Sequence, residues 1–277
     1  MARLFLLISV FTLSSCAIFG EYRHRHTHTT SLVQFLYPQG KLPLEDKRNP
    51  ILNLPLRVGL AFIPDRSSKQ VISPVLKNTL LENVKASFGS KGYVNEIVVI
   101  PEMYLQTSQG FGTLEQIKNL YQLDVIALVS YDQMVNAKDN LLSLSYLTIV
   151  GAYIFPGTGY QVNTMIDMAV IDVDSRSILF RAAGTSSSKN QIVAEGYRSQ
   201  AYRKRQNAEF ELAMGQMQGN LIVELTKFEQ RLGEKDPNDR IKVKHRKGYT
   251  GGSVSLFLLC LLFCMALFKF KYEFRNN

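Results

Sequence analysis

The chain has 277 residues and a formal net charge of +9; 46% of its residues are hydrophobic and 20% are charged. All four His and all three Cys residues lie outside residues 56–232, the stretch with the apolar density of a folded domain. Without these residue types, that stretch is excluded as a Ser-His-Asp or Cys-His catalyst and as a zinc site with His or Cys ligands.

The N-terminus has the features of a secretory signal. Arg3 precedes a short apolar segment that cannot span a membrane, which needs about 20 residues. Residues Leu13–Cys16, Leu-Ser-Ser-Cys, are similar to a bacterial lipobox. This resemblance implies removal of the signal peptide 1–15 and lipidation of Cys16, and Ala17 in place of an Asp implies delivery to the outer membrane. An ordinary signal peptide cut nearby is the alternative.

Residues 16–55 are predicted to be a lipidated N-terminus and tether, because Pro and charged residues are scattered there without periodicity. Much of the positive charge lies in Arg23-His24-Arg25 and in the predicted basic linker, residues 233–252. Basic runs are attracted to anionic headgroups, so both stretches are expected to be solvated and close to a membrane. Nucleic acid is not an expected partner, since no aromatic residues are interleaved with these charges.

Residues 56–232 alternate between the periods of strands and helices. The first predicted helix has an N-cap at Ser73, Pro at its first position, and apolar residues at i+4 intervals from Leu76 to Phe88. The predicted strands are 56–63, 97–100, 124–131, 165–173 and 178–183, a second helix opens at the capping-box pattern 113–116, and a long C-terminal helix carries apolar residues from Phe210 to Leu232.

The order β-α-β-α-β-β-β-α predicts a single mixed-sheet α/β sandwich with a long C-terminal helix. The polar break 174–177 between the last two strands indicates a hairpin. Residues 141–155 are apolar but interrupted by Ser143 and Ser145, so we expect a buried strand or short helix there rather than membrane contact. The stretch Leu114–Val129 resembles a helix-to-strand unit of the curli-secretion lipoprotein, of lipoprotein activators of penicillin-binding proteins and of the Tol periplasmic protein, which implies a protein-binding role.

The C-terminus, residues 253–277, is predicted to be a transmembrane sorting tail. Its apolar run from Ser253 to Phe268 would form a helix of about 24 Å, and the positive charges after it predict a cytoplasmic end with the preceding chain exported. Gly251 and Gly252 would fray the start of this helix, where an intramembrane protease needs access. The basic residues of the tail are Lys269, Lys271 and Arg275.

A Gly pair, a short apolar span and a basic end are together similar to the GlyGly-CTERM sorting tail. With a lipobox on the same chain, the sequence resembles the rhombotarget lipoproteins. The resemblance implies cleavage in the region of Gly251, Gly252 and Ser253 by a rhombosortase, a rhomboid-like intramembrane serine protease. The chain would then be anchored only transiently in the inner membrane. A permanent C-terminal anchor with an incidental Gly pair is the alternative.

No residue of the domain is predicted to be catalytic or to bind a cofactor. Asp167, Asp172 and Asp174 flank the hairpin, but Asp167 and Asp174 fall on opposite strand faces. Three His residues alternate along His24–His28 and could hold a metal ion loosely, which the neighbouring Arg residues oppose. Gly110–Gly112 and Gly157–Gly159 complete no phosphate-binding pattern and are expected in turns.

These features predict an exported, non-enzymatic lipoprotein of the outer membrane or cell surface of a Gram-negative bacterium. Its expected partners are lipoprotein-processing enzymes, a rhombosortase, membrane lipids through Cys16, and other envelope proteins; no cofactor and no metal are expected. The alternatives are a surface-attached hydrolase, which the missing His disfavours, and an uncleaved bitopic protein that assists an inner-membrane complex.

Overall fold

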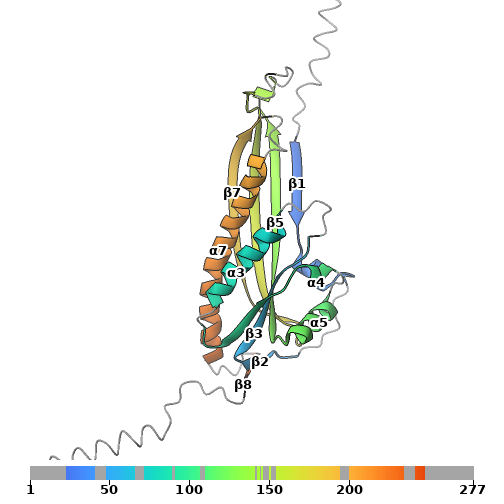
Figure 1. The fold of residues 1–277 in the computed structure, drawn as a ribbon, viewed down its shortest axis with the longest axis vertical. Coiled ribbons are helices and arrows are strands. Elements are labelled where there is room, and N and C mark those ends of the chain that lie inside the picture. Colours follow the sequence, from blue (N-terminus) through green and yellow to red (C-terminus); the bar gives the residue numbers. More distant parts are fainter. Residues whose placement is uncertain are drawn as a thin grey trace, which may run out of the picture.

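The computed structural model describes residues 23–40, 48–65, 72–88, 91–106, 110–140, 142–143, 145, 150, 154–193, 200–233 and 241–246. A six-stranded mixed sheet runs along the long axis of the molecule (Figure 1). Its strands are β1 (Arg23–Thr29), β3 (Leu56–Phe62), β4 (Val94–Val99), β5 (Val125–Asp139), β6 (Thr158–Asp172) and β7 (Ser177–Ile192). Their order is β4-β3-β5-β6-β7, and β1 pairs with β5 beside this path.

The sheet has two halves. β3 is parallel to β4 and to the first part of β5, as far as Val129, whereas β6 is antiparallel to both of its neighbours, β5 and β7. Beyond this point β1 takes the place of β3 and pairs antiparallel with β5, from Asp132 to Lys138. We call the half that contains β1 the tip half, because it ends at the β5–β6 connection.

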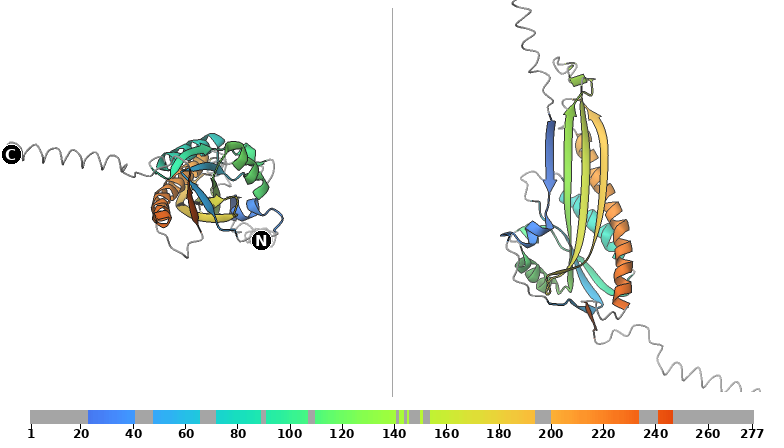
Figure 2. Two further views of the ribbon diagram at one scale, coloured as in Figure 1. Left: turned by 90° about the horizontal axis from the view of Figure 1, so that it is seen from below. Right: turned by 180° about the vertical axis from the view of Figure 1, so that it is seen from behind.

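Helices cover the two faces of the sheet unequally (Figure 2). α3 and α7 pack on one face, in a core that contains Phe62, Phe210 and Phe228. α2, α4 and α5 pack on the other face, around Leu114 and Leu128. The helices are α2 (Leu32–Leu36), α3 (Pro74–Phe88), α4 (Met103–Gln106), α5 (Phe111–Tyr121) and α7 (Gln200–Gly233).

The pattern of buried residues along β5 differs between the two halves of the sheet. Every residue from Val125 to Tyr131 is buried, since helices cover both faces there, whereas burial alternates from Asp132 to Lys138. In the tip half α7 covers one face, and we call the other the open sheet face. The 15 residues of β5 span about 50 Å, which makes the molecule elongated.

Within residues 56–232 the predicted order of strands and helices is confirmed, including the hairpin between β6 and β7, apart from the additional short helix α4. The last three strands are longer than predicted, because alternating polar and apolar residues extend them into the tip half. α5 begins at Phe111 rather than at the predicted capping box. Its N-cap is Gly110, whose φ of 92° favours glycine, and no side chain caps this helix.

The predicted tether and basic linker are strands in part, rather than irregular throughout, and the described side chains of β1 and β8 are mostly exposed. β1 belongs to the main sheet, while β2 (Ile51–Leu54) and β8 (Lys242–His245) form a second, parallel two-stranded sheet. After β8, the Arg246 guanidinium lies 2.8 Å from the Asp124 carboxylate. Charged and His residues occupy β1 and β8, so the apolar pattern of the sequence does not indicate these strands, whose pairing is made by backbone hydrogen bonds. The domain is therefore larger than residues 56–232.

The fold class requires a correction at the C-terminus. Within the part of the chain that the structure describes, no helix is long and apolar enough to cross a membrane. The longest of these helices, α7, has 34 residues, but exposed charges such as Glu211 and Glu229 lie along it. The predicted transmembrane segment, residues 253–277, lies outside the described residues. The fold class is thus a mixed-sheet α/β domain with a long helix α7.

The apolar segment 141–155, which connects β5 to β6, differs from its prediction as a buried element. Its described large apolar residues are Leu142, Val150, Ile154 and Phe155, and they are 48%, 65%, 62% and 47% exposed. Positions 141, 144, 146–149 and 151–153 lie outside the described residues. The described side chains extend beyond the end of the sheet, where the core clusters do not reach them.

Candidate functional site

A charged cluster lies where β3 and β4 end. Asp65 follows β3 and Glu102 follows β4, at the carboxyl edge of parallel strands, where α/β proteins commonly place their sites. Lys77 of α3 donates to both carboxylate oxygens of Glu102, over 3.2 and 3.0 Å. The Tyr131 hydroxyl donates to Asp65 Oδ2 over 3.0 Å, and the Asp65 amide donates to Glu102 Oε1 over 3.2 Å.

Burial decides what this cluster can do. Lys77 is 1% exposed, and its Nζ lies 5.6 and 5.1 Å from the ring centroids of Phe62 and Tyr131. Burial and the neighbouring Asp65 carboxylate raise the pKa of the Tyr131 hydroxyl far above its usual value, so Tyr131 donates a hydrogen bond and is no base at neutral pH. Lys77 and Glu102 satisfy each other's charge, which is the arrangement of a structural ion pair.

The apolar periodicity of the sequence did not indicate Lys77 as a buried residue, because the predicted stripe begins on a neighbouring face of α3. The predicted stripe contains Leu76 and Leu80, whereas the fully buried positions include Lys77 and Leu81. A signal was present: Lys77 precedes Leu81 by four residues, which places both on one helix face. The partner, Glu102, lies on a different element and is set by the packing of α3 on the sheet.

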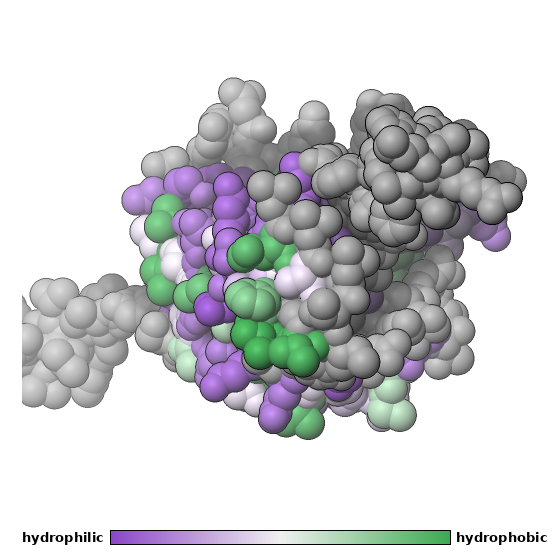
Figure 3. Space-filling view, turned by 90° about the horizontal axis from the view of Figure 1, so that it is seen from above, coloured by the Kyte–Doolittle hydropathy of each residue, from purple (hydrophilic) through white to green (hydrophobic). Residues whose placement is uncertain are grey.

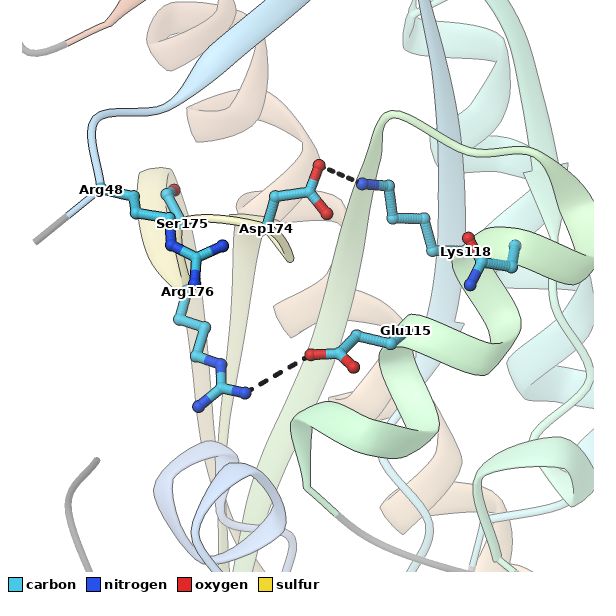
Figure 4. A pocket seen from close by; sticks show the side chains of 7 residues that line it. Arg48, Glu115, Lys118, Asp174, Ser175 and Arg176 are labelled. Carbon is cyan, nitrogen blue, oxygen red and sulfur yellow. Dashed lines mark hydrogen bonds and ion pairs between the residues drawn. The ribbon is translucent and has the colours of Figure 1, made fainter. Parts of the chain in front are cut away.

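A polar pocket of about 390 Å³ lies at the end of the molecule opposite the tip, between α5 and the β6–β7 turn (Figure 4). Opposite charges pair across it: Lys118 with Asp174, and Arg176 with Glu115 at 3.4 Å. Such a lining can hold a small polar ligand by hydrogen bonds. The lining residues are Arg48, Glu115, Lys118, Asn119, Asp174, Ser175 and Arg176.

The carboxylates of the β6–β7 hairpin do not converge. Asp167 makes an ion pair with Arg181 across the two strands, at 3.0 Å. Asp172 accepts a hydrogen bond from a backbone amide of the turn at 3.2 Å, and Asp174 pairs with Lys118. Each carboxylate therefore has a structural partner of its own. Among the residues that the structure describes, no three His, Cys, Asp or Glu side chains gather as metal ligands.

The open sheet face carries a second, shallow pocket of about 340 Å³. Met134 and Met165 add apolar surface to a polar row in which the Asn163 side-chain oxygen accepts hydrogen bonds from Gln161 and Ser187. This surface can pair with polar and apolar groups of a partner alike. Its pocket is lined by Asp132, Met134, Asn163, Thr164, Met165, Thr185, Ser186 and Ser187.

The residues predicted for lipidation and sorting lie outside the described residues; they are Cys16, Gly251, Gly252, Ser253, Lys269, Lys271 and Arg275. The structure does describe the segments of the chain that are nearest to these residues in sequence. β1 starts at Arg23 in the tip half, whereas β8 and Arg246 lie at the opposite end of the molecule (Figure 1). The alternating His residues belong to β1, and the side chains of His24 and His26 lie outside the described residues.

No family model matches this chain, and no curated protein matches it. A putative neuraminyllactose-binding hemagglutinin homolog from Helicobacter pylori is similar in structure over 70% of this chain and 96% of that chain, with 12% identity and a TM-score of 0.36. The PelC dodecamer from Paraburkholderia phytofirmans is similar over 70% of this chain and 99% of that chain, with 10% identity and a TM-score of 0.26. Such low scores and identities assign neither a family nor an activity to this chain.

Proposed function

We propose that this chain is an exported lipoprotein, lipidated at Cys16, whose domain is a non-catalytic interaction module at the outer membrane or cell surface. The observation that carries the proposal is the lipobox-like sequence Leu13–Cys16, which is followed after a short stretch by β1. Because β1 starts in the tip half, the acyl chains hold that end of the domain towards the lipid. Several acyl chains attach a protein durably, whereas one chain binds only marginally.

The surfaces of the domain support an interaction role. The open sheet face combines hydrogen-bonding side chains with Met134 and Met165, and Met side chains adapt to different partners. β7 is an edge strand of the main sheet, and an edge strand can accept a further strand from another protein. The lack of His and Cys in residues 56–232 supports a role without catalysis.

The C-terminal region is the second part of the proposal. Gly251 and Gly252, which precede an apolar run, support cleavage of the chain by a rhombosortase in their vicinity. The mature protein would then keep its N-terminal lipid as its lasting attachment. Mass spectrometry of the purified protein is expected to find a lipidated Cys16 and no peptides beyond about residue 255. Recovery of peptides from the end of the chain would contradict this cleavage.

Substitution of the lipidated residue tests the attachment. Cys16→Ala is expected to abolish lipidation and to move most of the protein out of the outer-membrane fraction, because no acyl chain can be attached to Ala. Fractionation with immunoblotting measures the change. Cys260→Ser is the matched control and should leave the location unchanged. If Cys16→Ala protein stays in the outer membrane at the wild-type size, the lipoprotein proposal is wrong.

A further inference from the structure

The connection between β5 and β6 exposes apolar side chains at one end of the molecule. We call Leu142, Val150, Ile154 and Phe155, which are between 47% and 65% exposed, the apolar tip. Residues 141–155 contain no charged residue. Figure 3 looks onto this end, where apolar surface gathers beside hydrophilic surface. Large apolar residues exposed together at one end of a molecule indicate an interaction site.

Hydrogen bonds hold the base of this connection. The Asn140 amide donates to the Gly157 carbonyl over 2.7 Å, and Asn140 Oδ1 accepts from the Leu142 amide over 2.8 Å. A Cβ at Gly157 would lie 2.5 Å from the backbone nitrogen of Ser143, so glycine allows the two sides of the connection to approach closely. The apolar tip therefore starts from a fixed base at the end of the β5–β6 ladder.

Exposed basic residues lie just below the apolar tip. Lys138 is next to the last residue of β5, and Lys189 of β7 pairs opposite Gln161 of β6. The first turns of α7 lie at the same level, since the Tyr202 ring packs against Tyr160 with centroids 5.3 Å apart. We call these exposed residues the basic collar: Arg25, Lys138, Lys189, Arg203, Lys204 and Arg205.

Acidic side chains are few at this level. Asp139, the last residue of β5, accepts a hydrogen bond from the Thr158 hydroxyl over 2.6 Å and is only partly exposed. Among the described residues at the tip, basic charges thus outnumber acidic ones. An apolar surface with a basic rim is the pattern of a protein that enters the boundary between headgroups and acyl chains of an anionic membrane.

The position of the N-terminus identifies which surface the tip meets. Arg23 pairs with Lys138 in the sheet, so the chain enters the domain beside the apolar tip. Arg23 is the seventh residue after Cys16, so the two are at most about 25 Å apart. An acyl chain on Cys16 thus keeps this end of the elongated domain close to the bilayer.

We propose that the apolar tip inserts into the lipid surface and that the basic collar contacts anionic headgroups. The orientation of the domain relative to the membrane rests on the proposed lipidation of Cys16. The affinity of the apolar tip for lipid rests on the residues of the tip itself. In this arrangement the long strands project from the membrane surface, and the polar pocket at the opposite end of the molecule faces the aqueous side. A second copy or a protein partner on the tip is the competing occupant.

The chain contains no Trp, so a single introduced Trp reports on one position. Phe155→Trp in the full chain is to be mixed with vesicles of phosphatidylethanolamine and phosphatidylglycerol that carry brominated acyl chains. We expect a blue shift of its emission and strong quenching, because residue 155 enters the acyl boundary. Leu120→Trp is the matched control: Leu120 is 67% exposed on α5, at the opposite end, and should be unaffected.

Neutralising the collar provides a second measurement. Each Lys or Arg beside an anionic surface strengthens binding roughly fivefold, so Arg203→Ala with Lys204→Ala should weaken binding to phosphatidylglycerol vesicles by about 25-fold. Lys85→Ala with Lys227→Ala removes two exposed charges elsewhere and should change binding little.

Three outcomes would overturn the proposal. They are unchanged Phe155→Trp emission on lipid addition, equal quenching at both Trp positions, and a blue shift without lipid that depends on protein concentration, which would place a second copy on the tip. The same titration of Cys16→Ser protein separates this inference from the proposed function, since it uses no acyl anchor. Quenching there supports insertion even if Cys16 is not lipidated. A lipidated protein without quenching overturns insertion alone.

Discussion

Glu102→Ala is expected to lower the free energy of unfolding by about 3–5 kcal/mol, because it leaves the buried Lys77 ammonium without a counter-ion. The Lys77 side chain is 2% exposed and that of Glu102 is 14% exposed, so water cannot replace the lost carboxylate without opening the core. Urea unfolding followed by circular dichroism measures the loss.

An exposed ion pair provides the matched control. Glu96 pairs with Arg57 at 2.9 Å, but its side chain is 51% exposed, so Glu96→Ala should cost less than about 1 kcal/mol. The double change Lys77→Met with Glu102→Gln should regain most of the stability, since it removes both charges from the cluster. If Glu102→Ala and Glu96→Ala cost the same, Lys77 is not desolvated as the structure indicates.

The second large effect is expected at Gly184, where β7 contacts the backbone of α7. A Cβ there would lie 2.2 Å from the Ala213 carbonyl oxygen and 2.3 Å from the Met217 nitrogen. Both are backbone atoms that cannot rotate away, so Gly184→Ala must move α7 off the sheet. We expect a loss of about 2–3 kcal/mol in the free energy of unfolding, the upper range for overpacking.

Two glycines of α7 provide the opposite result. A Cβ at Gly215 or Gly219 would meet nothing within 4 Å. Gly215→Ala and Gly219→Ala should therefore stabilise the protein by roughly 0.5–1 kcal/mol each, because Ala favours the helix. Thermal unfolding of the three variants side by side measures these signs. A stabilising Gly184→Ala would show that α7 does not pack against β7 as closely as described.

The periodicity of the sequence predicted the central elements well. Continuous apolar runs marked β3 and the first part of β5, and the order of strands and helices indicated a mixed sheet. The prediction failed where strands carry charged residues. β1 contains Arg and His, and β8 contains Lys, so neither has the apolar alternation of a strand. Their pairing depends on backbone groups of β5 and β2, which sequence periodicity does not register.

The candidate sites depended even more on tertiary structure. Asp65, Lys77 and Glu102 come from separate elements and meet only because two parallel strands end together under α3. The hairpin carboxylates, in contrast, were visible in the sequence, yet each of them pairs with a different neighbour. A residue type can be recognised along the chain, but whether it has a charged partner is decided by packing.

The sequence by itself determined the lipobox-like motif at Cys16, the absence of His and Cys from residues 56–232, and the alternation that builds the sheet. These are local properties of composition and spacing, so they need no contact between distant residues. Only the tertiary structure decided that β1 brings the N-terminus beside the β5–β6 connection and that the apolar residues of this connection are exposed. The exposure of a residue depends on which elements cover it, and the hydrophobic core clusters do not include the apolar residues of this connection.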